Sequence, residues 1–173
     1  MIVNIRYATM ADLDDIASVE SVCFPVLEAA TKEEFEQRIK YFGNHFWLMF
    51  DNDKLIAFVD GFVTDEANLT DEMYENASMH NENGAWQMIF GVNTLPEYRR
   101  CGYAKELIKK AILDAREQNR RGLVLTCKES LVPYYSKFGF VDEGITDKST
   151  HGNVLWHQMR LDFKLRNNGV KQI

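Results

Sequence analysis

The sequence predicts an α/β domain built on a mixed sheet. Between residues 85 and 137, strand-like and helix-like segments alternate twice, so at least one parallel pair of strands is joined by a crossover helix. Turn-like segments elsewhere predict antiparallel neighbours around that pair. The expected order is β-α-α-β-β-β-α-β-α-β-β. The chain has 173 residues and no internal repeat or linker, so we expect a single domain over 1–163 and a polar tail over 164–173.

The first part of the chain predicts one strand followed by two helices. Residues 2–8 form the expected strand, and Thr9 is the expected N-cap of the first helix because Asp12 follows three residues later. Pro25 ends this helix. The second helix is expected to begin near Thr31, with acidic residues in its first turn. Its inward face is apolar and consists of Phe35, Ile39 and Phe42.

Two further strands and a long polar segment come next. Residues 44–50 and 54–64 are predicted strands, joined by a turn whose composition at 51–53 is Asp-Asn-Asp. Residues 65–84 are rich in acidic residues and asparagine, with a short helix expected near 71–77. Segments of this kind are either binding loops or solvated surface insertions, and the sequence leaves both open.

The second half of the chain carries the alternating segments. A helix is expected over 102–119 because its apolar residues recur at helical spacing. The short apolar run 123–127 predicts a strand that is buried on both faces. The other expected elements are a strand over 85–94, a helix over 129–137, and strands over 140–147 and 153–163.

Composition narrows the possible functions. The net charge is −6, which disfavours nucleic acid as a partner and is compatible with a cationic amine. No apolar run reaches the length of a membrane span, and the N-terminus does not read as a signal peptide, so we expect no membrane partner and a cytoplasmic protein. Three widely spaced cysteines predict neither a disulfide framework nor a zinc site, and the four histidines predict no metal.

The most informative segment lies where the strand 85–94 turns into the helix that follows. It consists of Arg99, Arg100, Cys101, Gly102, Tyr103 and Ala104. The N–H groups at the start of a helix lack helical partners, and together with the helix dipole they bind anions such as a diphosphate. Gly102 lets the backbone approach the anion closely, and the two arginines can reach phosphate oxygens. The alternative is a solvated charge cluster beside an ordinary helix start.

A second motif is the segment Tyr134-Tyr135-Ser136-Lys137-Phe138-Gly139-Phe140. Gly139 is the expected C-cap of a helix, and adjacent tyrosines on a helix cannot share a face. Both tyrosines could be packing aromatics, or one could serve as an acid.

These two motifs, in this order, resemble the signatures of the GNAT superfamily of N-acetyltransferases. The resemblance rests on the pattern Arg-x-x-Gly-x-Ala at 99–104 and on Tyr-Ser-Lys-Phe-Gly-Phe at 135–140. It implies a GNAT-like acyl-CoA N-acyltransferase fold and acetyl-CoA as the acyl donor. It also implies that Tyr135 donates a proton to the leaving thiolate of coenzyme A, which a positioned acid makes a better leaving group.

The resemblance also implies a path for the cofactor. The diphosphate is expected on the loop 99–104, and the pantetheine arm is expected along Gly91, Val92 and Asn93 like an added strand. This requires the strands 85–94 and 122–127 to splay at their C-terminal ends. An N–H of Gly91 or Val92 is then expected to polarise the thioester carbonyl.

The segments 23–30 and 151–159 resemble bacterial relatives of the serotonin (arylalkylamine) N-acetyltransferases. Those enzymes carry two histidines before the cofactor loop, where this chain has Met88 and Phe90, neither of which can act as a base. The resemblance to amine acetyltransferases that use an early-chain Glu as base, together with its place beside the expected acceptor site, makes Glu28 the candidate base, with a capping or surface role as the alternative. His80 and Glu82 from the polar segment are the other candidates.

The expected acceptor is a small primary amine, an arylalkylamine or a polyamine. Parts of the polar segment 65–84 and three aromatic side chains are expected to wall its site, the aromatic residues being Phe24, Phe90 and Trp156. Two other functions remain open: a protein N-terminal or lysine acetyltransferase, and a non-catalytic acyl-CoA sensor. The sequence also leaves a homodimer open.

Overall fold

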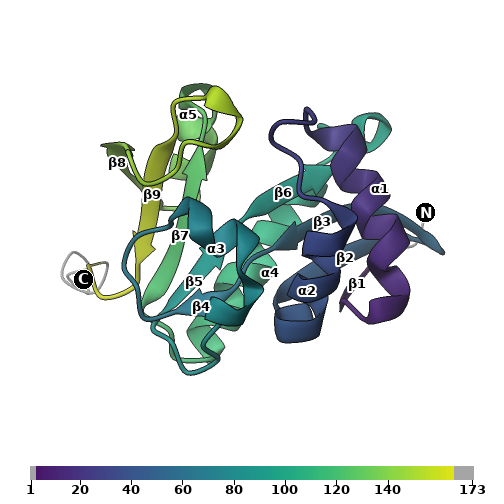
Figure 1. The fold of residues 1–173 in the computed structure, drawn as a ribbon, viewed down its shortest axis with the longest axis horizontal. Coiled ribbons are helices and arrows are strands. Elements are labelled where there is room, and N and C mark those ends of the chain that lie inside the picture. Colours follow the sequence, from purple (N-terminus) through teal and green to yellow (C-terminus); the bar gives the residue numbers. More distant parts are fainter. Residues whose placement is uncertain (1–2, 166–173) are drawn as a thin grey trace, which may run out of the picture.

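The computed structural model describes residues 3–165, which form two sheets joined where the chain passes from β5 to β6 (Figure 1). The predicted mixed α/β class is confirmed. Of the expected tail over 164–173, only Lys164 and Leu165 lie within the described residues. Among the described helices, none combines the length and the apolar composition that a membrane span requires.

The first sheet is antiparallel and has the spatial order β1-β2-β3-β6. Its strands are β1 (Val3–Tyr7), β2 (Phe46–Asp51), β3 (Lys54–Asp60) and β6 (Gly91–Thr94). The predicted turn between β2 and β3 is confirmed, with Asn52 in the left-handed region at a φ of 52°. Asparagine tolerates this conformation better than most residues.

The second sheet has the spatial order β4-β5-β7-β9-β8. Its strands are β4 (Val63–Thr64), β5 (Trp86–Ile89), β7 (Gly122–Cys127), β8 (Val141–Ile145) and β9 (His157–Asp162). β5 and β7 are parallel, and helix α4 (Tyr103–Glu117) lies between them in the chain. This is the parallel pair with a helical crossover that the alternating segments predicted.

The predicted strands 54–64 and 85–94 are each divided in two. The first divides at Gly61, where a Cβ would collide with the backbone of β5. The second divides at Phe90, whose N–H donates to the carbonyl of Asp60 at 2.7 Å as the chain leaves β5 for β6. At these points the chain passes from one sheet to the other. The alternation of apolar and polar residues along a sequence does not reveal such a change of sheet.

The helices begin near their predicted caps. The carboxylate of Asp12 accepts the N–H of Thr9 at 2.8 Å, although the first turn is a 3₁₀ helix (Met10–Asp12) that precedes α1 (Leu13–Cys23). The hydroxyl of Thr31 accepts the N–H of Glu34 at 3.2 Å and caps α2 (Lys32–Phe42). Two short helices complete the set, α3 (Asp71–Glu75) and α5 (Val132–Ser136).

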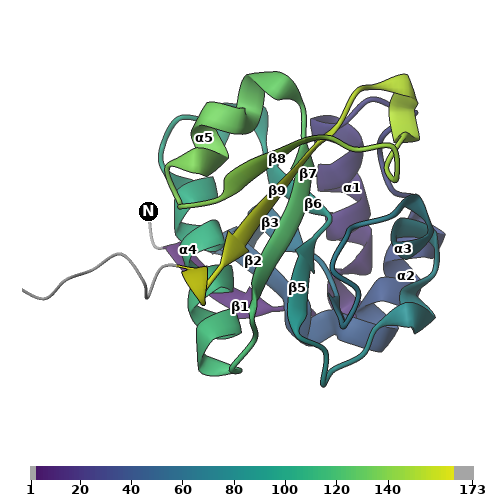
Figure 2. The ribbon, with the colours of Figure 1, turned by 90° about the vertical axis from the view of Figure 1, so that its left-hand side faces the viewer.

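Helices cover both faces of the first sheet: α1 and α2 lie on one face and α4 lies on the other (Figure 2). The buried strand β2 shows this division, because Phe46 and Leu48 join the core under α1 and α2 while Trp47 and Met49 join the core under α4. Strands that are buried on both faces read as continuous apolar runs. The rigid sheet between two cores fixes the position of β6, on which the site is built.

Candidate functional site

The start of α4 offers unpaired backbone amides. The first helical bond runs from the N–H of Glu106 to the carbonyl of Gly102 at 3.1 Å, so the amides of residues 102–105 lack acceptors within the helix. Arg100 and Gly102 both have positive φ, at 61° and 84°. A Cβ built on Gly102 would meet no atom of the described chain within 4 Å. The loop therefore presents a row of donors to open space, as a diphosphate requires.

The parallel strands separate next to this loop. β5 pairs with β7 from Trp86 to Ile89, whereas β6 pairs with β3 (Figure 1). The N–H of Leu95 donates to the carbonyl of Ile56 on the β3 side at 2.9 Å. Backbone groups alternate along a strand, so the amides of Gly91 and Asn93 also face β3, and the amide of Val92 faces the opening.

A small apolar cavity extends from β6 towards Tyr135. It is lined by residues of β3, β5, β6, β7, α4 and α5, among them Val92, Leu125 and Tyr135. Tyr135 is only 7% exposed, and this burial raises the pKa of its hydroxyl, so that it stays protonated at neutral pH. Tyr134 is half-buried, which fits the expectation that adjacent helical tyrosines point differently.

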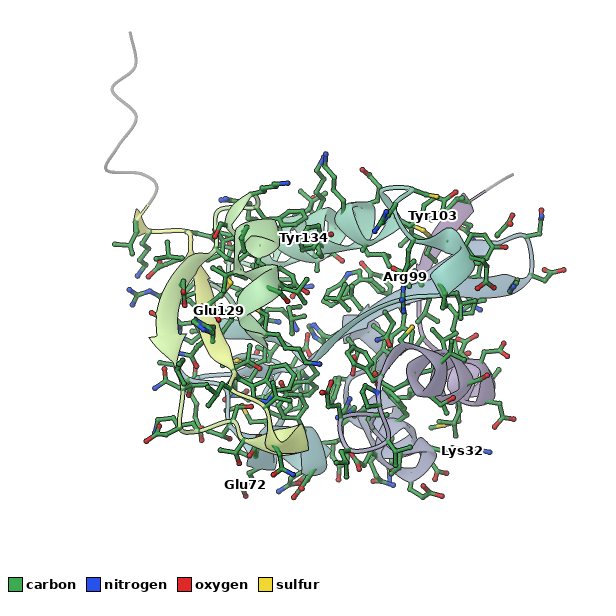
Figure 3. The ribbon with its side chains drawn as sticks, turned by 90° about the horizontal axis from the view of Figure 1, so that it is seen from above. Lys32, Glu72, Arg99, Tyr103, Glu129 and Tyr134 are labelled. Atoms are coloured by element: carbon green, nitrogen blue, oxygen red, sulfur yellow. The ribbon has the colours of Figure 1, made fainter. Side chains whose placement is uncertain are left out.

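The side chains of the loop do not all point towards its amides. The Nε of Arg99 donates to the carbonyl of Thr94 at 3.0 Å, so Arg99 lies against the end of β6. Cys101 is exposed beside it. Figure 3 shows Arg99 and Tyr103 on one side of the opening and Tyr134 on the other. The loop and the tyrosine helix thus face each other across the separated strands.

On the other side of β6 lies a cavity of about 270 Å³. Its lining includes six carboxylates, from Glu20, Glu28, Glu34, Asp60, Asp71 and Glu75. It also includes four aromatic rings, from Phe24, Tyr74, Phe90 and Trp156. Arg38 is the only basic side chain among the described residues that line it. The structure therefore places the three aromatic residues expected from the sequence around one strongly acidic cavity.

The polar segment 65–84 contributes directly to this cavity. Leu69 and Met73 are fully buried in the core, and Met73 lies on α3. This anchoring holds Tyr74 and Glu75 at the cavity wall. The segment is therefore anchored in the core and lines the cavity rather than being wholly solvated, and a binding role for it remains a prediction.

Glu28 lies in the same cavity but has a cationic partner. Its Oε1 is 2.9 Å from the Nζ of Lys128, and its side chain packs against Gly152. Its second oxygen, Oε2, is buried and has no hydrogen-bond partner among the described residues. Glu28 therefore connects the segment after α1 to the segments that follow β7 and β8.

Sequence reasoning missed a buried polar cluster beneath the cavity. Arg38 donates to the Oδ2 of Asp60 at 3.0 Å, and both side chains are almost completely buried. Glu20 and Asn93 lie nearby and are also buried. One signal was available: Glu20 and Arg38 occupy positions on the apolar stripes of α1 and α2, where a charged residue is unusual.

The carboxyl groups of this cluster have raised pKa values. Burial is the main cause for both, and the negative charge of Asp60 adds to the effect on Glu20, whose pKa rises from 4.5 to about 8. The Arg38 guanidinium opposes the rise at both carboxyls. At neutral pH, Glu20 therefore carries a proton, while the direct bond from Arg38 favours the ionised form of Asp60.

Replacing Glu20 by Gln is expected to change how stability depends on pH. A raised pKa means that the folded protein holds a proton that the unfolded chain releases between pH 4.5 and about 8. The free energy of unfolding of the unmodified protein then falls with rising pH, by up to about 1.4 kcal/mol per pH unit. Gln cannot titrate, so the variant should gain stability relative to the original between pH 5.5 and 8 in urea denaturation. A constant difference over this range would contradict the shifted pKa.

Another polar cluster lies outside the cavity. His45, His80 and Glu82 bring three potential metal-ligand atoms within 4.8 Å of one another. The Nδ1 of His80 accepts the N–H of Val63 at 3.1 Å, so its Nε2 carries the proton and donates to Glu82 at 2.7 Å. A metal at this Nε2 would require an imidazolate. These hydrogen bonds account for the arrangement of the cluster, and the expectation of no metal remains a prediction.

Comparisons with known proteins agree with this geometry. A model of the acetyltransferase (GNAT) family matches residues 13–140. The serotonin N-acetyltransferase of Mesocricetus auratus is 30% identical over 93 residues, which is 53% of this chain and 43% of that protein's length. The loading GNATL domain of CurA from Lyngbya majuscula has a TM-score of 0.82 at 17% identity, covering 96% of this chain and all of that chain.

A further solved structure shares the fold at a similar level of identity. The PaiA N-acetyltransferase from Thermoplasma acidophilum, in complex with coenzyme A, has a TM-score of 0.67 at 17% identity. The alignment covers 93% of this chain and 100% of that one.

Proposed function

Because this chain belongs to the acetyltransferase (GNAT) family, we propose that it transfers the acetyl group of acetyl-CoA to a small primary amine. One observation carries the proposal: β6 has an amide-lined opening on one side and an acidic, aromatic cavity on the other. An acyl donor and a cationic amine that entered from these two sides would meet at the start of β6. Bringing the two reactants together supplies much of the rate.

The donor side has groups that suit each part of coenzyme A. The amides of residues 102–105 would hold the diphosphate, and Arg100 would add a charge contact. The pantetheine arm would lie along Gly91, Val92 and Asn93. Arg99 donates to the carbonyl of Thr94 and would have to leave it in order to reach the phosphates. The cofactor supplies a thioester whose carbonyl carbon is open to attack by an amine.

Two groups on either side of the opening would assist the transfer. The N–H of Val92 points to the opening and would stabilise negative charge on the carbonyl oxygen, a role for which the amide of Gly91 faces the wrong side. The hydroxyl of Tyr135 would give its proton to the departing sulfur, since burial keeps it protonated.

The lining of the cavity supports a cationic acceptor. Acidic side chains outnumber the one arginine in the lining, although Glu20 is protonated at neutral pH and Glu28 is paired with Lys128, and this excess favours an ammonium group. The aromatic rings favour either an aryl group or cation–π contact with a second amine. Similarity to a serotonin N-acetyltransferase supports an arylalkylamine, whereas the acidic lining supports a polyamine. Three groups in the cavity lining are available to accept the proton of the amine, namely Glu28 and the buried carboxyls of Glu20 and Asp60.

An acceptor panel tests the proposal. Purified protein with acetyl-CoA is expected to release free thiol with phenethylamine, tryptamine, putrescine or spermidine. Its kcat/KM for the best amine should exceed that for a peptide with a free N-terminus by at least ~10-fold, because the acidic cavity favours a compact cation. Thiol release with peptides alone would indicate a protein acetyltransferase instead. Cofactor binding without thiol release for any acceptor would indicate a sensor.

A further inference from the structure

Three buried polar atoms converge on one point at the start of β6. A Cβ built on Gly91 would lie 3.2 Å from the Nδ2 of Asn93, 3.3 Å from the Oδ1 of Asp60 and 3.7 Å from the Oε1 of Glu20. The three side chains come from β6, β3 and α1. Glycine at this position therefore leaves free the space between two carboxyl groups and an amide.

Two acceptor atoms of this cluster have unused hydrogen-bonding capacity. The Oδ1 of Asp60 and the Oδ1 of Asn93 are buried, without a hydrogen-bond partner among the described residues. Leaving such a buried atom unpaired is destabilising. At this point Asp60 Oδ1 is an acceptor, and the Oε1 of Glu20 is a stronger acceptor when Glu20 is ionised, whereas Asn93 presents its Nδ2 donor. A primary ammonium, with its three N–H donors, complements the two carboxyl groups.

The cluster lies where the acceptor's nitrogen would have to react. Glu20, Asp60 and Gly91 all line the acidic cavity. Gly91 directly precedes Val92, whose amide faces the opening on the donor side. A nitrogen seated at this point would be one residue along the backbone from the expected position of the thioester.

We propose, on the basis of the proposed function, that Glu20 and Asp60 together bind the ammonium group of the acceptor and accept the proton that it loses before attack. Asn93, whose Nδ2 faces the same point, donates to the carboxyl of Glu20 and favours its ionised form. Arg38 holds Asp60 in place through its bond to the other carboxylate oxygen. Glu28 is less suited to this role because one of its oxygens is paired with Lys128.

The protons balance. The nitrogen loses two protons in going from ammonium to amide. The carboxyl pair accepts the first, which leaves the lone pair that forms the new N–C bond as the C–S bond breaks, and the pair later gives this proton to water. Tyr135 gives its proton to sulfur, and the second proton of the nitrogen replaces it. No oxidant or other reactant is required.

The surrounding charges decide when the pair can accept a proton. Three groups face Glu20: the carboxyl of Asp60 on β3, the guanidinium of Arg38 on α2 and the thiol of Cys23 on α1. The other acidic side chains that line the cavity contribute negative charge, and the Tyr74 hydroxyl contributes none. Because the pKa of Glu20 is about 8, Glu20 must lose its proton at neutral pH before the carboxyl pair can bind the ammonium and accept its proton. A bound ammonium favours this loss by charge attraction.

Calorimetry can measure this loss directly. The full chain saturated with coenzyme A is titrated at pH 7 with phenethylamine and with spermidine, in phosphate and in Tris. Buffer-dependent heats report the protons released, and about one proton per bound amine is expected because both partners start protonated.

Three variants sharpen this experiment. Glu20→Gln should fold normally, since Gln mimics the protonated carboxyl, and should release no proton. Asp60→Asn should weaken amine binding by at least ~10-fold. Exposed Glu33→Gln on α2 is the matched control and should behave like the original protein.

Three results would overturn the proposal that Glu20 and Asp60 bind the ammonium. They are no binding of either amine, no proton release by the original protein, and full proton release by Glu20→Gln. If the release disappears in Glu28→Gln but persists in Glu20→Gln, Glu28 is the acceptor. Acetyl transfer separates the two proposals. A protein that acetylates amines but fails this test keeps its proposed function, whereas one that passes it without acetylating amines binds the ammonium as proposed and lacks the function.

Discussion

Replacing Tyr135 by Phe is expected to lower kcat by roughly 10²- to 10⁴-fold while the dissociation constant of acetyl-CoA changes by less than about two-fold. The reason is that the phenol ring lines a small apolar cavity beside β6, and Phe preserves this packing. Only the hydroxyl, which would protonate the departing thiolate, is removed. Stopped-flow detection of free thiol gives kcat, and isothermal calorimetry gives the affinity.

Tyr134 provides the matched control for this experiment. It is the adjacent residue on α5, its ring centroid lies 5.1 Å from that of Tyr135, and it is half-buried. Tyr134→Phe removes the same hydroxyl from the same helix and should leave kcat within about three-fold of the original. Equal turnover in the two variants would remove Tyr135 from the mechanism.

Replacing Gly102 by Val is expected to raise the dissociation constant of coenzyme A by at least ~30-fold, about 2 kcal/mol. Gly102 has a φ of 84°, and a branched side chain at this φ is strained and would project into the space in front of the amides. Calorimetric titration with coenzyme A measures the loss. Circular dichroism and the melting temperature show whether the chain remains folded.

Gly144 separates local strain from cofactor binding. It lies on β8, has a φ of 91°, and a Cβ built on it also meets no described atom within 4 Å. Gly144→Val should therefore lose a similar amount of stability, about 1–2 kcal/mol, without weakening coenzyme A binding. Unchanged affinity in Gly102→Val, or equal loss in both variants, would contradict the assignment of the diphosphate to this loop.

Much of the fold could be predicted because local signals carried it. The caps at Thr9 and Thr31, the turn at Asn52, and the apolar stripe of α4 each reflect contacts close in sequence. The division of two predicted strands could not be predicted. It depends on the approach of Gly61 to β5 and on the bond from Phe90 to Asp60, which are tertiary contacts.

The candidate site shows the same division between local and distant information. The loop at 99–104 is one continuous segment, so its residue types indicate its chemistry directly. The acidic cavity is assembled from segments far apart in the chain, and among its carboxylates the sequence indicated only Glu28 and, without naming residues, the segment 65–84. Glu20 and Asp60 were overlooked because their importance comes from shared burial beside Gly91, which neither position reveals alone.

The central claim is that the amides at the start of α4 hold the diphosphate of the acyl carrier. Paired calorimetric titrations with coenzyme A and with pantetheine, which lacks the diphosphate and the nucleotide, test it most directly. Coenzyme A should bind at least ~100-fold more tightly than pantetheine, with the difference falling in Gly102→Val, because about 3 kcal/mol would come from charge-assisted bonds to the loop. Failure of coenzyme A to bind, or equal affinity for the two ligands, would contradict the account.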